Sequence, residues 1–206
     1  ALALIAGIGG PLDIRAAAAD TGSSDALAAL GIVLPITLII QAFANLIGLG
    51  GAPRAGIKLG EGNRTEANRI FNTAFVLLLL LGIVIGAATF VFARPIILLF
   101  GCPASAVEYA VSYLKIYACG TVFVMLSQGL NPFILTQGNS FIAMSSVLLG
   151  AIINILLDPV FIFGMGLSVA GSGLATVLSQ LCSCICILCF FFSRKSLFRF
   201  AGGEMR

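Results

Sequence analysis

Long apolar runs, almost free of charge, dominate this 206-residue sequence. Five of them are long enough to cross a lipid bilayer, which takes about 20 apolar residues in a helix. Because the runs are continuous rather than alternating, and every backbone polar group must be satisfied within lipid, only helices suit them. The sequence therefore predicts an all-α membrane protein with spans at about Ala26–Leu49, Ala74–Phe92, Leu114–Leu135, Phe141–Phe163 and Val169–Phe192.

The composition argues against several classes of protein. Charged residues make up 9% of the chain, whereas a typical soluble domain carries about 25%. The absence of histidine from the sequence removes Ser-His-Asp and Cys-His catalysis and imidazole metal sites. We find no nucleophile–base pair or metal-ligand cluster, so a membrane enzyme ranks last among the functions. A net charge of only +3 does not indicate nucleic acid as a partner.

A shorter apolar segment, Ala1–Leu12, precedes these spans. It is too short to cross the membrane alone, so we interpret it as the surviving end of a first span that is truncated or atypical. The sequence starts with Ala1 rather than Met, which suggests a fragment or a processed product. We therefore expect a six-helix transmembrane bundle that forms a single lobe over residues 1–206.

The basic residues between the spans predict the orientation of the chain, because they collect on the cytoplasmic side. Eight of the eleven lie in the second loop and the tail, and three lie on the other side. We therefore expect both termini in the cytoplasm, with a cytoplasmic loop at about 52–70 and a cytoplasmic tail or inter-lobe linker at 193–206. In the loop, Asn63 and Glu66 have the spacing of a capping box and predict a short surface helix.

Small residues and prolines inside the spans predict how the helices pack. Gly82 and Gly86 form a GxxxG pair, which lets another helix approach closely. Pro35, Pro132 and Pro159 interrupt the helical hydrogen bonds. Helices that bend in this way are commoner around a cavity than in a rigid anchor.

Polar side chains within the spans leave two alternatives open, a substrate cavity or hydrogen bonds between helices. They are Gln41, Asn45, Gln128 and Asn131. Three tyrosines that recur every four residues form one helical stripe, which we interpret as an anchor at the water boundary in preference to a substrate cage. These are Tyr109, Tyr113 and Tyr117.

Asp158 is the only acidic residue well inside one of the five spans. A carboxylate there costs about 2.5–3.5 kcal/mol on an insertion scale, so it should face the bundle interior or a water-filled cavity. Asn154 precedes it by four residues and lies on the same helical face. Pro159 frees a backbone carbonyl near residue 155 as a further oxygen. The alternative is that Asp158 only caps a helix interrupted at Pro159.

The next span brings Thr176 to a matching depth. Asp158 lies roughly 8 Å and Thr176 roughly 10 Å below the same outer boundary, at 1.5 Å per residue. Gly171 and Gly173 should let the two helices approach each other. With Asn154, these side chains form an oxygen-only set that suits a hard cation such as Na⁺, or a transferable proton. We expect no organic cofactor and no other metal site.

Three segments resemble the amino-terminal lobe of bacterial multidrug and toxic compound extrusion (MATE) transporters. They are GLGGAPRAGIKLGEGNRTEANRIFNTAF, NPFILTQGNSFIAM and GAIINILLDPVFIFGMGLSVAGSGLATVLSQ, within a resemblance that covers about Asp25 to Arg199. It implies a multi-pass protein of the bacterial inner membrane that forms one of two six-helix lobes. Members of this family exchange sodium or protons for small cationic, often aromatic, drugs.

The resemblance also implies a cation site in this lobe. In the family, the site is built from an aspartate in the first span, an Asn and an Asp four residues apart in the fifth, and a Thr in the sixth. Asn154, Asp158 and Thr176 match the last three positions, and Asp13 stands near the first. Around Asp13, Arg15 and an alanine run replace the family's apolar and aromatic residues.

We therefore predict the amino-terminal half of a cation-coupled multidrug efflux antiporter that works by alternating access. Its partners are membrane lipid and a second six-helix lobe or a second copy. A lipid or polysaccharide flippase of the same superfamily is one alternative, although it would favour a larger cationic cavity than these few charges supply. A non-transporting structural subunit or an inactive fragment is the other.

Overall fold

A computed structural model of the chain describes residues 24–165, 168–193 and 196–198. Every regular element of this described part is a helix, and five of the helices are long and apolar enough to cross a membrane, which confirms the all-α membrane fold class. The predicted first span, Ala1–Leu12, lies outside the described residues. The elements are α2 (Ser24–Gly60), α3 (Arg64–Val91), α4 (Ala93–Leu99), α5 (Val107–Thr136), α6 (Ser140–Pro159), a π-helical turn η1 (Val160–Gly164) and α7 (Ser168–Phe192).

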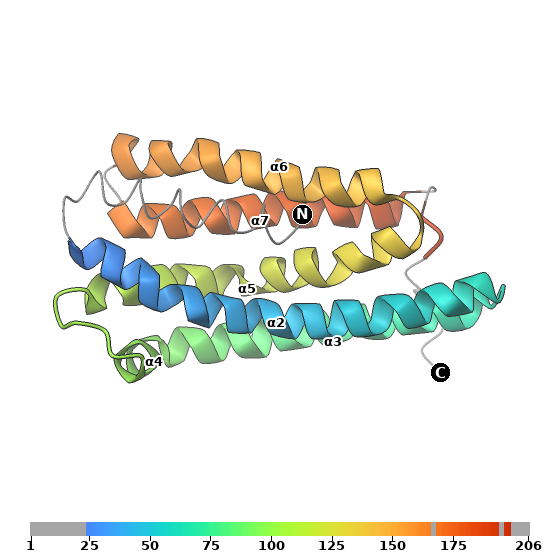
Figure 1. The fold of residues 1–206 in the computed structure, drawn as a ribbon, viewed down its shortest axis with the longest axis horizontal. Coiled ribbons are helices and arrows are strands. Elements are labelled where there is room, and N and C mark those ends of the chain that lie inside the picture. The colour runs from blue at the N-terminus through green and yellow to red at the C-terminus, as the bar shows by residue number, and fades with distance from the viewer. Residues whose placement is uncertain (1–23, 166–167, 194–195, 199–206) are drawn as a thin grey trace.

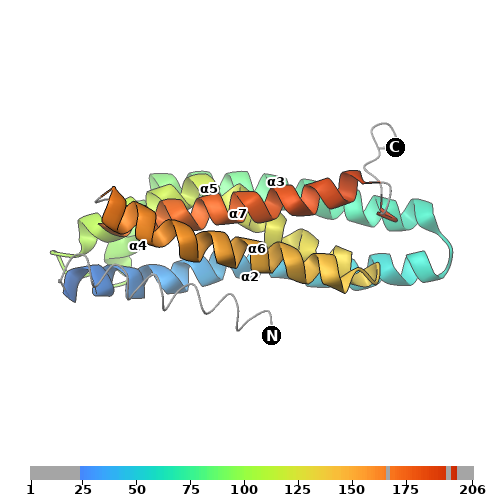
Figure 2. The same cartoon turned by 90° about the horizontal axis from the view of Figure 1, so that it is seen from above.

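Helix α5 is the centre of the bundle. The long helices lie side by side along one axis (Figures 1 and 2), and α5 packs against α2, α3 and α7. Helix α6 packs mainly against α7, and the short α4 lies at the end where α3 leads into α5. Because α5 is enclosed by three helices, it is the most deeply buried of the five candidate spans.

Glycines make the closest helix contacts around α5. A β-carbon added at Gly48 of α2 would lie 2.5 Å from the Gly129 carbonyl oxygen of α5. A β-carbon at Gly86 of α3 would lie 2.8 Å from the Ala118 carbonyl oxygen. Gly82, one turn away, also faces the α5 backbone. The predicted GxxxG pair therefore does bring another helix close, and that helix is α5.

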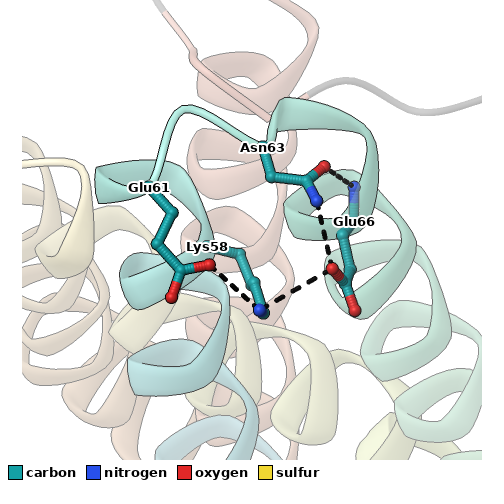
Figure 3. A network of polar contacts seen from close by, with 4 residues as sticks. All are labelled: Lys58, Glu61, Asn63 and Glu66. Atoms are coloured by element: carbon teal, nitrogen blue, oxygen red, sulfur yellow. Dashed lines mark hydrogen bonds and ion pairs between the residues drawn. The ribbon is translucent and has the colours of Figure 1, made fainter.

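The turn between α2 and α3 carries a network of polar contacts (Figure 3). The Asn63 side chain accepts a hydrogen bond from the Glu66 backbone N–H at 3.1 Å, which confirms the predicted cap. The Glu66 carboxylate accepts from the Asn63 side-chain amide, because the Asn63 backbone N–H is already donated to the Lys58 carbonyl. The Lys58 ammonium lies 3.0 Å from the Glu61 carboxylate and 3.8 Å from that of Glu66.

The chain around this turn differs from the expected loop at 52–70 with its short surface helix. Helices α2 and α3 both extend into the segment, so the capped helix is the beginning of a spanning helix. The physical reason is that Ala52, Ala55 and Ala67 are buried. These small apolar residues let the extra turns pack, while the polar residues that suggested a loop occupy the outer faces.

Two of the three tyrosines of α5 lie inside the bundle. Tyr113 and Tyr117 are buried, and their rings are stacked with centroids 6.3 Å apart, whereas Tyr109 is exposed. The predicted anchor at the water boundary is therefore wrong for Tyr113 and Tyr117. Helix α5 begins at Val107, two turns before the predicted span, and its neighbours cover this face.

The residues after α7 fold back onto the end of the bundle that carries the α5–α6 turn. The fully buried ring of Phe198 stacks on Phe71 of α3, with centroids 5.3 Å apart. The Gln137 side-chain oxygen, just after α5, accepts the Leu197 backbone N–H at 2.7 Å. The first part of the predicted tail therefore belongs to the core, while residues 199–206 lie outside the described part of the chain.

We predict that Gly48→Val destabilises the bundle. The new side chain collides with the α5 backbone, and overpacking of this kind costs about 1–3 kcal/mol. The thermal midpoint of the purified chain in detergent measures the effect. Gly50→Val is the matched control, because a β-carbon at Gly50 meets nothing within 4 Å. Equal losses in the two variants would show that the α2–α5 contact is not limiting.

Candidate functional site

Asp158 is the only buried carboxylate among the described residues, and the residue is 3% exposed. It stands near the end of α6, directly before Pro159. A buried carboxylate is costly unless a cation or hydrogen-bond donors compensate its charge, or unless it takes up a proton. This position is therefore chemically distinct from the rest of the described bundle.

Helix α6 presents one buried face, which consists of small and polar residues. Asn154, 8% exposed, lies on this face one turn before Asp158, as the spacing predicts. Its side-chain nitrogen has no hydrogen-bond partner among the described residues. The members of the face are Ala143, Ser146, Gly150, Asn154 and Asp158.

Helix α7 packs against this face of α6. The Ser183 hydroxyl donates to the Ser146 carbonyl at 3.0 Å, and a β-carbon at Gly150 would collide with the Ser183 hydroxyl. Toward the other end, a β-carbon at Gly171 would lie 3.0 Å from the carbonyl carbon of Phe161 in η1. These contacts set an antiparallel register between α6–η1 and α7.

In this register, Asn154 is level with Thr176, and Asp158 is level with Ser172. The Thr176 hydroxyl donates to the Ser172 carbonyl at 3.0 Å, so its oxygen lone pairs point away from that bond. The three predicted ligands Asp158, Asn154 and Thr176 therefore lie within one helical turn of each other, along adjoining helices. Their oxygens are of the kind that holds a hard cation.

Sequence reasoning missed Ser172, which lies in the same region. Its only available signal was its position one helical turn before Thr176. The flanking glycines also divide their roles, since Gly171 faces η1 whereas Gly173 faces Ile116 of α5. Neighbouring helical positions differ by about 100°, so two residues this close in sequence point toward different helices.

The backbone changes geometry directly after the carboxylate. Pro159 has no N–H, so the Ile155 carbonyl loses its usual helical donor. In the following π-helical turn, the Met165 N–H is donated to the Val160 carbonyl at 3.1 Å. Such turns occur frequently at functional sites. The backbone is therefore interrupted directly beside the carboxylate, as the sequence predicts.

Asn131, one of the four predicted cavity residues, binds neighbouring helices. Its side-chain amide donates to the Ala143 carbonyl at 3.0 Å and to the Ser146 hydroxyl at 3.1 Å, which ties α5 to α6. Similarly, the Ser127 hydroxyl donates to the Gln180 side-chain oxygen at 2.7 Å and ties α5 to α7. Hydrogen bonding between helices therefore accounts for the burial of Asn131.

The other predicted site residues are more scattered. Gln41 lies on α2 and is half-buried. Asn45 of α2 and Gln128 of α5 are half-buried. Asp13, the fourth predicted cation ligand, lies outside the described residues.

The similarity of this chain to known proteins is evidence that does not depend on the site geometry. Residues 14–160 match the MatE family model. The multidrug export protein MepA of Staphylococcus haemolyticus is 32% identical over 174 residues, which cover 84% of this chain and 38% of MepA. The FAD transporter of Shewanella oneidensis is 30% identical over 162 residues, which cover 77% of this chain and 36% of that transporter.

Solved structures give the same picture of the fold. An inward-facing multidrug resistance MATE family transporter of the MOP superfamily matches with a TM-score of 0.86 and 25% identity, covering 92% of this chain and 43% of that one. A MATE crystal structure in the bent conformation matches with a TM-score of 0.89 and 24% identity, covering 97% and 46%. The chain therefore spans less than half the length of each of these relatives.

We predict that Asn131→Ala destabilises the bundle while Asn45→Ala does not. The first change removes two interhelical hydrogen bonds, each worth about 0.6 kcal/mol in membrane proteins, whereas Asn45 makes none with the described residues. Unfolding midpoints in mixed detergent measure both variants. A loss for Asn45→Ala as large as that for Asn131→Ala would contradict this division of roles.

Proposed function

Because this chain belongs to the multidrug and toxic compound extrusion (MATE) family, we propose that it forms the amino-terminal lobe of a cation-coupled multidrug efflux antiporter. The observation that carries the proposal is the buried Asp158, which shares a face of α6 with Asn154 and lies within one turn of the level of Thr176. The matched relatives are transporters rather than enzymes.

Ion coupling in this proposal depends on the charge of Asp158. The carboxylate binds either Na⁺ or a proton, and Asn154 and Thr176 supply neutral oxygens that favour a metal ion. Burial disfavours the bare negative charge, so the carboxylate holds either a proton or a cation. Na⁺ can bind only after the proton has left. Proton and Na⁺ therefore compete for one site.

Alternating access then follows from the backbone beside the carboxylate. Pro159 and the π-helical turn η1 interrupt the regular α-helix directly after Asp158. Ion binding and release change the charge next to this interruption. We propose that the resulting change in bend transmits ion occupancy to the pathway side of the lobe.

Small cationic or aromatic drugs are the proposed substrates, because MepA is a multidrug export protein. The relative described as an FAD transporter makes a larger aromatic anion the second candidate. A lobe of this size requires a second six-helix lobe or a second copy to enclose a pathway, since the chain spans 38% of MepA.

We also propose that the α2–α3 turn faces the cytoplasm. Four basic residues gather at this end of the described bundle, compared with Arg94 and Lys115 near the α4 end, which supports the orientation through the positive-inside rule. The four are Arg54, Lys58, Arg64 and Arg69.

Asp158→Asn is expected to abolish the dependence of drug efflux on imposed Na⁺ and pH gradients in proteoliposomes. Asparagine keeps the shape of the side chain but cannot titrate or carry charge, so expression and thermal stability should stay close to those of the wild type. Asp25→Asn is the control, because it makes the same change at a carboxylate that is not buried, at the start of α2. Wild-type coupling to both gradients in Asp158→Asn would reduce the carboxylate to a helix cap.

The orientation is tested by cysteine accessibility in a background from which the native cysteines have been removed. A Lys58→Cys variant should react with a membrane-impermeant maleimide only from the cytoplasmic side, and Ala104→Cys, in the exposed loop before α5, only from outside. Bacterial spheroplasts and inverted vesicles supply the two sides. The reverse pattern would overturn the proposed topology.

A further inference from the structure

The hydroxyl of Ser172 is a buried polar group whose partner is not found in the described bundle. The residue is 0% exposed, and its side-chain oxygen makes no hydrogen bond with any described group. Buried hydroxyls in native proteins almost always have a partner, and in membrane helices lipid offers none. The group therefore calls for a ligand that is not part of the described protein.

Two other buried hydroxyls, those of Thr121 and Ser179, bond to a backbone carbonyl of their own helix. Thr121 donates to the Tyr117 carbonyl at 3.1 Å, and Ser179 donates to the Thr176 carbonyl at 2.8 Å. Both bonds stay within one helix, as is common for Ser and Thr. Ser172 does not make this bond, although it lies in the regular helix α7. Its oxygen therefore remains available.

The direction of Ser172 follows from the residues that share its helical face. Ser183, three turns further along α7, faces α6, because its hydroxyl donates to the Ser146 carbonyl and lies against Gly150. One stripe of α7 carries four hydroxyl residues at spacings of four, three and four, which are the spacings of a single helical face. They are Ser183, Ser179, Thr176 and Ser172. Ser172 therefore points toward α6 as well.

The level of Ser172 follows from the antiparallel register of α6 and α7. The Ser183–Ser146 hydrogen bond and the close approach of Gly171 to Phe161 bracket the pair. Between these points, Ser172 is level with Asp158. The Ser172 carbonyl is also the acceptor of the Thr176 hydroxyl, which couples the two residues directly.

We infer that the Ser172 hydroxyl oxygen is a further ligand of the cation bound at Asp158, and that it makes Na⁺ the coupling ion. This inference rests on the proposed function of the site. A metal cation is held by several oxygens at once, so each neutral oxygen adds to its affinity. A proton needs only the carboxylate and gains no coordination from a further oxygen. Ser172 thus favours Na⁺ over a proton without adding a charge to the membrane interior.

The test uses Na⁺ binding rather than transport. The purified chain in lipid nanodiscs is heated in increasing NaCl, with choline chloride keeping the ionic strength constant. The wild type should gain thermal stability with Na⁺, because a ligand that binds only the folded state stabilises it. Ser172→Ala should raise the half-maximal Na⁺ concentration about three- to tenfold, the effect of losing roughly one polar interaction.

Matched variants separate a ligand from a packing residue. Ser179→Ala removes a hydroxyl two turns further along α7 that already bonds to its own helix, so the Na⁺ midpoint should not move. Ser172→Cys keeps nearly the same volume but offers sulfur, which hard cations avoid, so it should behave like Ser172→Ala. This second variant keeps the test decisive if Ser172→Ala folds poorly.

The outcomes distinguish this inference from the proposed function. A Na⁺ response that Asp158→Asn abolishes but both Ser172 variants retain unchanged would overturn the role of Ser172 and leave the cation site intact. A wild type whose stability depends on pH through Asp158, but not on Na⁺, would also overturn it and make the proton the coupling ion. A wild type that responds to neither ion would remove the proposed function itself.

Discussion

Close backbone contact around α5 is the constraint on which the rest of the bundle depends. In lipid, apolar side chains gain little by packing against each other instead of against acyl chains, so tight packing and interhelical hydrogen bonds hold helices together. Gly48 and Gly86 bring α2 and α3 onto the α5 backbone, and Gly120 of α5 receives Val177 of α7. Helix α5 thereby orders three neighbours, and α7 in turn positions α6.

Polar groups inside the bundle fall into two sets with different physical roles. Those of Asn131, Ser127 and Ser183 bond between helices and join α5, α6 and α7. The second set lies further along the same α6–α7 contact, where the side-chain nitrogen of Asn154 and the hydroxyl of Ser172 have no partner among the described residues. One pair of helices thus combines a half joined by interhelical hydrogen bonds with a half that holds two unpartnered polar groups near a buried carboxylate.

Much of this architecture could be predicted from the sequence, because each relevant rule acts within one segment. The membrane allows only helices for long apolar runs, so the predicted spans Phe141–Phe163 and Val169–Phe192 agree with α6–η1 and α7 to within one residue. The Asn63 cap depends on four successive residues, and the shared face of Asn154 and Asp158 depends only on helical spacing. The resemblance to the MATE family was visible for the same reason, since its motifs are local.

The rotation of each helix about its axis was decided by the tertiary structure. Spacing shows that Tyr113 and Tyr117 share a stripe, but only the packing of α5 shows that this stripe is buried. Likewise, the sequence could not tell that Gly173 faces α5 while Ser172 points toward α6, because a helix repeats its faces without indicating which neighbour each one meets. The sequence by itself determined the helices, their spans and the placing of one carboxylate within lipid. The tertiary structure decided which further polar residues, such as Ser172, lie level with that carboxylate, since this depends on the register of α6 and α7, which close glycine contacts set.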